Sequence, residues 1–472
     1  MEHVVLNDVQ KDVLALPPIG HHVILGTAGS GKTTMALLRA VGLSNLPQSG
    51  RVLLVTFNRA LVQYMAQMLG SSSSNIKIEI FHKFARGYLS HRGKMPEGKA
   101  IVENDEKIKL IEKAIQELKK EFPNESTYRR PVMAFVDEIV FMERFGINNM
   151  DEYIEIKRIG RAAVNIKREN RKWFYKVYEL YLKYRLEAGF MYDWDDIALY
   201  VYRELMQDNS PRLYTHIIVD EGQDFSPMML KSLVKAIPSD GSFTFFGDVA
   251  QQIYGSRMSW RDSGIEIRGN KIWKFDRNYR NPRTIAEFAR DITKSEFWST
   301  DDDMVISQDV LADGPKPVLI SFSSKENEMN WLIGQIKKNM NKSSVVVILR
   351  NRSMVEYVKT KLKYNSIIAI EIKKDIGFAL ENNVYVSTFH SVKGLEFENV
   401  YIPLLDDDIF PDWEMIGKSI DQERAISDEL KLLYVAVTRS QYAVFMSYNN
   451  KLSRLFPINA KSYDGYREKD VM

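Results

Sequence analysis

Four oxygen-bearing side chains follow directly after a short apolar run in the middle of the chain. Residues 215–227 read T-H-I-I-V-D-E-G-Q-D-F-S-P, and the run His216–Val219 predicts a buried strand. Within the next five positions lie Asp220, Glu221, Gln223 and Asp224. Asp and Gly are common where a strand ends in a surface turn, so a turn without chemistry is one interpretation. A cluster of ligands for a metal ion and a water molecule is the other.

A glycine-rich loop near the N-terminus favours the second interpretation. Residues 22–34 read H-V-I-L-G-T-A-G-S-G-K-T-T, which fits G-x-x-x-x-G-K-[ST] between a predicted strand and a predicted helix. Such a loop turns backbone N–H groups toward phosphate oxygens at a helix N-terminus. We therefore predict an ATP site made by Gly26, Thr27, Ala28, Gly29, Ser30, Gly31, Lys32, Thr33 and Thr34.

Hydrolysis at this loop would need Lys32 on the β- and γ-phosphates and the Thr33 hydroxyl on Mg²⁺. It would also need a second Mg²⁺ ligand from a neighbouring strand end and a residue that positions the attacking water. Asp220 is placed to hold Mg²⁺, directly or through water, and Glu221 to orient and deprotonate the water. The turn after Val219 is therefore predicted to be catalytic.

The composition is that of an ordinary globular protein. The 472 residues suggest roughly three domains at about 150 residues each. No stretch resembles a membrane span of about 20 apolar residues, and no signal peptide is predicted. Cysteine is absent, which excludes disulfides and thiolate metal sites and fits a cytoplasmic location. The net charge of +3 is compatible with nucleic acid but is weak support for it.

Short apolar runs alternate with helical stretches in two parts of the chain. This alternation is typical of parallel α/β sheets, and two clusters of runs predict two sheets. The expected strands are Val23–Leu25, Val52–Val55, Ile217–Val219 and Phe243–Phe246 in the first cluster, and Val318–Ile320, Val345–Leu349, Val384–Val386, Val400–Ile402 and Val444–Met446 in the second.

Residues 86–195 differ from both clusters, because they are rich in Lys, Glu, Tyr and Leu and carry few strand signals. They are predicted to form a helical insertion in the first α/β unit. The predicted organisation is a nucleotide-binding domain of residues 1–85 and 196–270, the insertion of residues 86–195, and a second domain of residues 271–472.

The phosphate loop and the D-E-x-Q-D sequence together resemble the superfamily 1 helicases, and specifically the UvrD/Rep/PcrA group. Seven more stretches resemble motifs of that group in the expected order: L-N-D-V-Q at 6–10, V-T-F-N at 55–58, F-H-K-F at 81–84, G-D-V-A-Q-Q-I-Y at 247–254, N-Y-R-N at 278–281, T-F-H-S-V-K-G-L-E-F at 388–397 and L-L-Y-V-A-V-T-R at 432–439. The resemblance implies two RecA-like P-loop domains of the α/β class with parallel sheets, plus a mostly helical insertion in the first.

The resemblance also implies roles for matching residues. Gln10 would read the adenine edge, Tyr279 would stack on adenine, and Glu396 would meet the ribose. Gln251 would couple the γ-phosphate to the nucleic-acid site, while Arg280 and Arg439 would contact the γ-phosphate from the second domain. The implied catalytic set is Lys32, Asp220, Glu221, Gln251, Arg280 and Arg439. For Lys393 in the same motifs, a surface position and a ligand role are both open.

Single-stranded nucleic acid is bound by aromatic stacking and a basic backbone track. The candidates for stacking are Phe57, Phe81, Tyr254 and Trp260, and those for polar contacts are Thr56, Asn58, His82 and His390. Trp260 aligns with a stacking tryptophan of the group only across an apparent insertion, so a core tryptophan is the alternative. Seven of the sixteen residues at 157–172 are Lys or Arg, which fits either phosphate contact or a solvated helix face.

Larger members of the group carry an extra domain, called 2B, between their fourth and fifth motifs, which here are N-Y-R-N at 278–281 and T-F-H-S-V-K-G-L-E-F at 388–397. Here about 105 residues separate Arg280 from Val386, and these must also supply strands of the second sheet. Little remains for a 2B domain, which bears on duplex unwinding in the larger relatives. Translocation needs only the two motor domains.

The predicted function is an ATP-dependent 3′–5′ translocase or helicase on single-stranded DNA, with tailed duplex as a further substrate. The alternative is a nucleotide-gated subunit that binds nucleic acid and switches a protein partner such as a nuclease, for example in antiviral defence. A motor on RNA is a third interpretation. Directional strand displacement would separate the first from the second.

Overall fold

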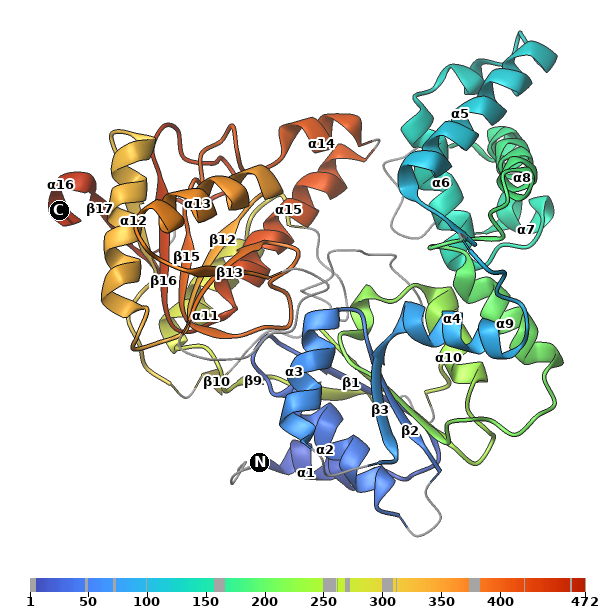
Figure 1. Ribbon diagram of the computed structural model, residues 1–472, viewed down its shortest axis with the longest axis horizontal. Coiled ribbons are helices and arrows are strands. Elements are labelled where there is room, and N and C mark those ends of the chain that lie inside the picture. Colours follow the sequence, from blue (N-terminus) through green and yellow to red (C-terminus); the bar gives the residue numbers. More distant parts are fainter. Residues whose placement is uncertain are drawn as a thin grey trace.

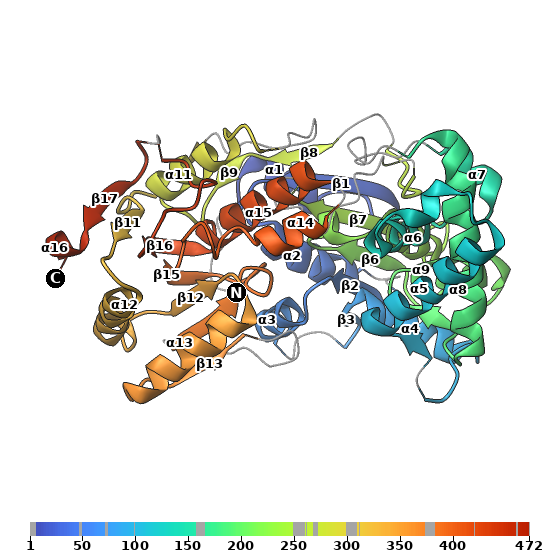
Figure 2. The same cartoon turned by 90° about the horizontal axis from the view of Figure 1, so that it is seen from above.

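The computed structural model contains two sheet domains and a helical insertion. The second domain lies at the left of Figure 1, the first at the lower centre, and the insertion at the upper right. Seen from above, the second domain and the insertion lie at opposite ends with the first domain between them (Figure 2). The structure describes residues 6–46, 50–70, 74–98, 100–156, 166–248, 260, 262–267, 272–298, 309–310, 312–372, 383–419, 421–458 and 461–471.

The first domain is built on a six-stranded sheet in which all paired strands are parallel. In spatial order its strands are β3 (Ile76–Ile80), β2 (Val52–Thr56), β6 (His216–Val219), β7 (Ser242–Gly247), β1 (Gly20–Gly26) and β8 (Trp273–Phe275). Every residue of β2, β6 and β7 is buried, as expected of inner strands of a parallel sheet covered on both faces. Because β8 pairs with β1, this sheet extends beyond the predicted boundary at residue 270.

Alternate residues of these strands face two separate cores. Ile24, Leu54 and Ile218 pack in one core with residues of the helices α2 (Lys32–Ser44) and α3 (Arg59–Leu69). Their neighbours Val23, Leu53 and Ile217 pack in the other core with residues of α4 (Phe81–His91), α9 (Ile197–Gln207) and α10 (Pro227–Lys235). Because successive side chains of a strand point to opposite faces, both faces of the sheet are apolar, and each is covered by a layer of helices. The short helix α1 (Asp8–Leu14) precedes β1.

The insertion begins and ends at a two-stranded ribbon of β4 (Ile101–Val102) and β5 (Tyr192–Asp193). Between these strands lie α5 (Asn104–Glu121), α6 (Val132–Phe145), α7 (Met150–Glu155) and α8 (Arg171–Glu187). The aromatic residues of α8 that recur at helical spacing are core residues of the insertion: Phe174, Tyr178, Tyr181 and Tyr184. Residues 157–165 of the basic segment lie outside the described part of the chain.

A buried charge network joins the insertion to the first domain. The Nζ atom of Lys107 on α5 lies 2.7 Å from Glu143 Oε2 on α6 and 2.6 Å from Asp193 Oδ2 on β5. Arg185 on α8 pairs with Asp196, the residue just before α9. All five side chains are buried, so each charge depends on its partner for compensation. The Lys107 ammonium sits among carboxylates that could otherwise share a cation, and we assign no metal to this cluster.

The second domain has a seven-stranded sheet whose paired strands are also parallel. Its strands, in spatial order, are β13 (Ala369–Glu371), β14 (Val384–Thr388), β12 (Val345–Leu349), β15 (Phe397–Ile402), β16 (Ser440–Tyr448), β11 (Val318–Ser321) and β17 (Asp464–Arg467). Its helices are α11 (Arg283–Thr293), α12 (Lys325–Asn339), α13 (Arg352–Tyr364), α14 (Trp413–Lys418), α15 (Gln422–Val437) and α16 (Glu468–Val471). A separate pair, β9 (Arg277–Asn278) and β10 (Asp309–Val310), lies between the two sheets in sequence.

The predicted α/β class with two parallel sheets is confirmed, and each of the nine expected strands lies within an observed one. Residues 312–372, which fall between the fourth and fifth motifs, supply β11, α12, β12, α13 and β13 of the second domain. No separate domain occurs in that described interval, as the spacing predicts.

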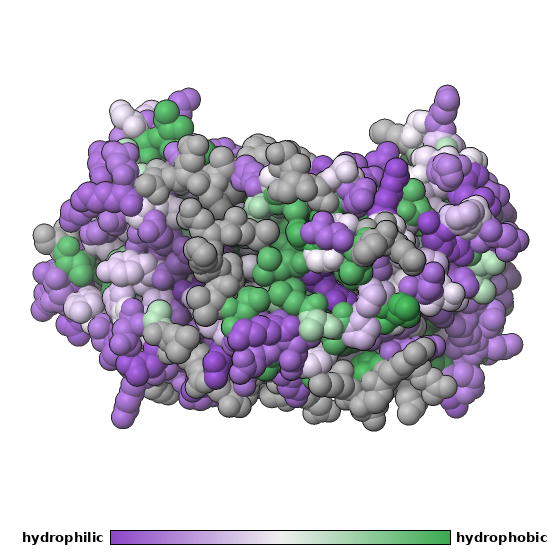
Figure 3. Space-filling view, turned by 90° about the horizontal axis from the view of Figure 1, so that it is seen from below, coloured by the Kyte–Doolittle hydropathy of each residue, from purple (hydrophilic) through white to green (hydrophobic). Residues whose placement is uncertain are grey.

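The face seen from below is mostly hydrophilic at both ends, and hydrophobic side chains gather near its centre (Figure 3). Among the described helices, none combines the length and the hydropathy needed to cross a membrane.

The charge network predicts a specific stability effect. Replacing Lys107 by Met should lower stability by about 3–5 kcal/mol, because two buried carboxylates lose their cation. Calorimetry would measure this as a lower unfolding midpoint. Lys109→Met on the same helix is the matched control, because Lys109 pairs with Glu106 only at the surface and should matter by less than about 0.5 kcal/mol. Equal midpoints for the two variants would contradict the role given to the network.

Candidate active site

The phosphate-binding loop connects β1 to α2 and has the backbone that an anion site requires. Gly29 and Gly31 adopt φ angles of +74° and +82°, in the left-handed region that glycine tolerates. Helix α2 begins at Lys32 without a side-chain cap at Gly31. The N–H groups of its first turn therefore point toward the loop without a capping acceptor, which favours a bound phosphate.

The lysine of the loop is buried among acceptors. Lys32 Nζ donates to the carbonyl oxygens of Gly26 at 3.0 Å and Thr27 at 2.6 Å. It also lies 3.6 Å from Oδ2 of Asp248, which follows β7. These contacts hold the ammonium over the loop, where a β- or γ-phosphate oxygen would lie.

Thr33 and Asp220 meet although they are far apart in sequence. The Thr33 hydroxyl donates to Asp220 Oδ2 at 2.7 Å, while Asp220 Oδ1 is buried with no hydrogen-bond partner among the described residues. Burial and the neighbouring Glu221 carboxylate raise the pKa of Asp220 to about 7. A hydroxyl, a carboxylate and an orphaned oxygen fit Mg²⁺, which prefers oxygen ligands. When bound, Mg²⁺ would neutralise phosphate charge at this point.

Glu221 is held in an unusual backbone conformation directly after Asp220. Its φ of +54° is rare for a residue with a side chain, and such strain is concentrated at functional sites. Gln223 Nε2 donates to Glu221 Oε2 at 2.5 Å. Burial acts to raise the pKa of Glu221, but Lys393, Lys32 and Arg439 outweigh it, so the pKa lies below the ordinary value. Glu221 is thus an oriented carboxylate facing the loop.

Lys393 of the second domain binds the acidic turn of the first. Its Nζ atom lies 2.7 Å from Asp224 Oδ1 and 4.0 Å from Glu221 Oε2, and both side chains of the closer pair are buried. The carbonyl oxygen of Lys393 accepts from Asn58 Nδ2 at 2.9 Å. Lys393 is therefore buried and not at the surface, and its role as a ligand stays a prediction.

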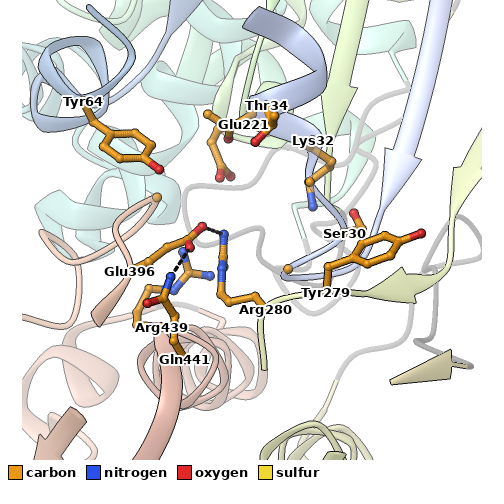
Figure 4. Close-up of a pocket in the computed structure, with 14 residues that line it drawn as sticks. Ser30, Lys32, Thr34, Tyr64, Glu221, Tyr279, Arg280, Glu396, Arg439 and Gln441 are labelled. Carbon is orange, nitrogen blue, oxygen red and sulfur yellow. Dashed lines mark hydrogen bonds and ion pairs between the residues drawn. The ribbon is translucent and has the colours of Figure 1, made fainter. Parts of the chain in front are cut away.

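The phosphate loop and Glu221 line a cavity of about 350 Å³, and the second domain supplies two arginines to it. Arg280 pairs with Glu396, and Gln441 Nε2 donates to Glu396 at 2.9 Å. Arg439 lies between α15 and β16, and its Nε donates to Val435 O at 2.9 Å. Figure 4 shows these residues on one side of the cavity, with Lys32 and Glu221 on the other.

The predicted adenine end of the cavity is formed by the first helix and the turn after β9. Asn7 caps α1 and forms a reciprocal pair of hydrogen bonds with Gln10. Gln10 Nε2 donates to Ser30 O at 3.3 Å, which places this amide against the phosphate loop. Asn7 Nδ2 donates to the Tyr279 hydroxyl at 2.6 Å, and Tyr279 remains 39% exposed. Asn7 thus links Gln10 to Tyr279, and the contacts of these two residues with adenine stay predictions.

Two predicted nucleic-acid contacts are wrong. Phe81 is fully buried and packs against Phe225 and Phe84 in the core, so it has no face to offer a base. Thr56 is the last residue of an inner strand and is also fully buried. Motif position alone indicates these two residues, whereas the pleat of the sheet and the start of α4 turn their side chains inward.

The other predicted contacts are placed differently. Phe57 and His82 are partly buried with ring centroids 6.3 Å apart, and His390 is partly buried after β14. The Asn58 side chain caps α3 by accepting from Ala60 N at 2.9 Å, and it also donates to the carbonyl oxygen of Lys393. It therefore links the first domain to the second. Trp260 is partly buried and packs against the core residue Phe245, with the two ring centroids 5.0 Å apart. Gln251 and Tyr254 lie outside the described residues.

A hollow of about 640 Å³ lies next to His82, between α3 and α4. Trp194 forms part of its wall, with its ring 5.3 Å from the His82 ring and its carbonyl oxygen 3.2 Å from His82 Nε2. The hollow is also lined by Arg59, Lys83 and Arg86. An aromatic ring and several cations are the components of a single-strand site.

Several residues of the sites were not predicted. Asp248 stands in G-D-V-A-Q-Q-I-Y, so its motif position could have indicated it. Trp194 lies between Asp193 and Asp195 in a stretch to which the sequence assigns no chemistry. Tyr64 and Gln441 line the ATP cavity without any sequence signal, because Tyr64 is one position of an amphipathic helix and Gln441 one of a strand.

Comparison with known proteins gives two family matches and several relatives. Residues 6–272 match the UvrD/REP helicase N-terminal domain, and residues 362–451 match the UvrD-like helicase C-terminal domain. A probable DNA helicase of Mycoplasma pneumoniae is 25% identical, over 99% of this chain and 86% of its own length. A probable DNA helicase II homolog of Mycoplasma capricolum is 26% identical over 67% of this chain and 44% of its own length. DNA helicase II of Haemophilus influenzae is 24% identical over 61% of this chain and 40% of its own length.

The chain thus spans less than half the length of the last two relatives. The names of these three relatives give no support to a partner-switching subunit as the alternative function. The family matches and the name of the first relative confirm the predicted enzyme class, a DNA helicase. Since the first family match alone covers more than half of the chain, the chain belongs to the UvrD/REP helicase family.

Proposed function

We propose that the chain is a motor that moves 3′–5′ along single-stranded DNA, driven by ATP-dependent closure of its two sheet domains. The observation that carries the proposal is the division of charge across the domain boundary. Asp220, Glu221 and Asp224 belong to the first domain, whereas Lys393, Arg280 and Arg439 belong to the second. A site completed only when two bodies meet can convert nucleotide turnover into relative motion.

ATP would enter with its phosphates on the loop Gly26–Thr34 and its adenine between Gln10 and Tyr279. Thr33 and Asp220 would hold Mg²⁺. Glu221 would accept the proton of the attacking water, because its lowered pKa keeps it ionised at neutral pH. Arg280 and Arg439 would meet the charge that develops on the γ-phosphate oxygens.

Closure of the domains would reach the strand through the loop after β2. Asn58 follows Phe57 in that loop and binds the carbonyl oxygen of Lys393, whose ammonium binds Asp224. Lys393 therefore contacts both the catalytic turn, through its ammonium, and the predicted strand-binding loop, through its carbonyl oxygen. Loss of the γ-phosphate would change the distance between the two surfaces, one on each domain, that bind the strand. Movement along single-stranded DNA requires such a change.

The strand would continue into the hollow lined by Trp194, His82 and Arg86. Its aromatic and cationic walls suit a base and the phosphates of a single strand. Tailed duplex as substrate, a protein partner and a cytoplasmic location stay predictions from the sequence.

Glu221→Gln tests the catalytic assignment. The amide keeps the size of the side chain but cannot take a proton, so turnover should fall by about 10²–10⁴-fold. Phosphate release would measure turnover, and a fluorescent ATP analogue would show that binding persists. Glu112→Gln, on an exposed position of α5, is the control and should match the wild type. Normal turnover in Glu221→Gln would remove this residue from the chemical step.

The motor itself is tested by ATP hydrolysis with single-stranded DNA, duplex DNA or single-stranded RNA. We expect single-stranded DNA to stimulate most. Streptavidin displacement then gives direction: a 3′–5′ motor should strip streptavidin from a 5′-biotinylated strand and not from a 3′-biotinylated one. Faster release at the 3′ end would reverse the direction, and turnover indifferent to all three nucleic acids would refute the motor.

A further inference from the structure

Asn281 is fully buried in the turn that follows β9, and every polar atom of its side chain is hydrogen-bonded. Its Nδ2 donates to Thr438 O at 3.1 Å and to Ser440 O at 2.5 Å. Its Oδ1 accepts from Asn278 Nδ2 at 3.0 Å. Thr438 and Ser440 are the residues on either side of Arg439. One amide therefore holds the backbone on both sides of this arginine.

Arg280 is tied to the same unit. Its backbone N–H donates to Asn278 Oδ1 at 3.0 Å, and that oxygen also accepts from the N–H of Asn281 at 3.1 Å. The Nη1 atom of Arg280 lies 3.5 Å from Thr438 O, the carbonyl that Asn281 also binds. The two arginines, 159 positions apart in sequence, are thus fixed to each other through Asn278, Asn281 and Thr438.

The turn also touches the phosphate loop. The N–H of Tyr279 donates to Gly29 O at 2.9 Å. A Cβ atom at Gly29 would lie 2.2 Å from Asn278 Oδ1 and 2.8 Å from Arg280 Cβ, so the approach admits only glycine. Hydrogen bonds consequently run without interruption from the phosphate loop through the turn 278–281 to the backbone around Arg439.

We propose that Asn281 is a positioning residue for phosphoryl transfer, which holds Arg280 and Arg439 at one fixed separation so that both reach the γ-phosphate together. The proposal rests on the proposed function, in which both arginines contact that phosphate. Asn281 itself is fully buried and does not line the cavity. Its contribution is preorganisation, since cations already in place need no rearrangement as charge develops.

Two variants of Asn281 test this in the full-length chain. Asn281→Ala removes the side-chain bonds, and Asn281→Asp keeps the size but cannot donate to the two carbonyls. We expect each to lower kcat by about 10–100-fold, because a displacement of about 1 Å is enough for such a loss. KM for ATP should stay within about threefold, since Gln10 and the phosphate loop, which bind ATP from the first domain, are unchanged.

Asn399→Ala is the matched control. Asn399 is a buried asparagine of the same domain whose Nδ2 donates to Ser343 Oγ at 2.7 Å, in a hydrogen bond that involves no residue of the ATP cavity. Unfolding midpoints of all variants would show that each is folded under assay conditions. If Asn281→Ala and Asn399→Ala lower the midpoint equally and both keep wild-type kcat, Asn281 is merely structural and the proposal fails.

A double-variant cycle separates this proposal from the proposed function. If Asn281 acts through the arginines, Asn281→Ala should lower kcat by a smaller factor in the Arg439→Ala background than in the wild type. Losses that multiply would overturn the positioning role while leaving Arg439 catalytic. Wild-type kcat in Arg439→Ala would instead overturn the role of Arg439 in the proposed function, and with it the premise for Asn281.

Discussion

The boundary between the two sheet domains is organised by buried carboxylates that need cations from across the gap. Asp220, Glu221 and Asp224 follow one strand of the first domain and are all buried. Burial and Glu221 raise the pKa of Asp224 to about 6, although Lys393 at 2.7 Å opposes the shift. Separating the domains would expose these charges to water, and joining them demands matched partners. A bound nucleotide would add the negative charge of its phosphates to the carboxylates and cations at this boundary.

The fold serves this constraint in two ways. Parallel strands bring the loops after β1, β6 and β7 to one edge of the first sheet, which places Lys32, Asp220 and Asp248 together. In the second domain, the loops that precede β15 and β16 carry Glu396 and Arg439 and face this edge of the first sheet. The insertion is attached to the first domain by a separate buried charge network around Lys107. That network shares no residue with the charged groups at the boundary between the two sheet domains.

The sequence was informative where short-range pattern decides the structure. Buried parallel strands read as apolar runs, and the phosphate loop is defined by spacing, so both were predicted. Strand β8 was not, because W-K-F carries little signal apart from its pairing with β1. Phe81 and Thr56 were misplaced because a motif gives a position and not the direction of a side chain. Trp194 and Asn281 acquire their roles from contacts with residues about 110 to 160 positions away, which no local pattern reveals.

If nucleotide state sets the separation of the two sheet domains, a distance measured between one label on each domain should change with the nucleotide. The chain has no cysteine, so cysteines introduced at the exposed positions Gln67 on α3 and Lys363 on α13 would be the only sites for spin labels. Double electron–electron resonance on labelled Glu221→Gln would compare samples with ATP, with ADP and without nucleotide. We expect a shorter and narrower distance distribution with ATP than with ADP or without nucleotide. Identical distributions in all three would contradict it.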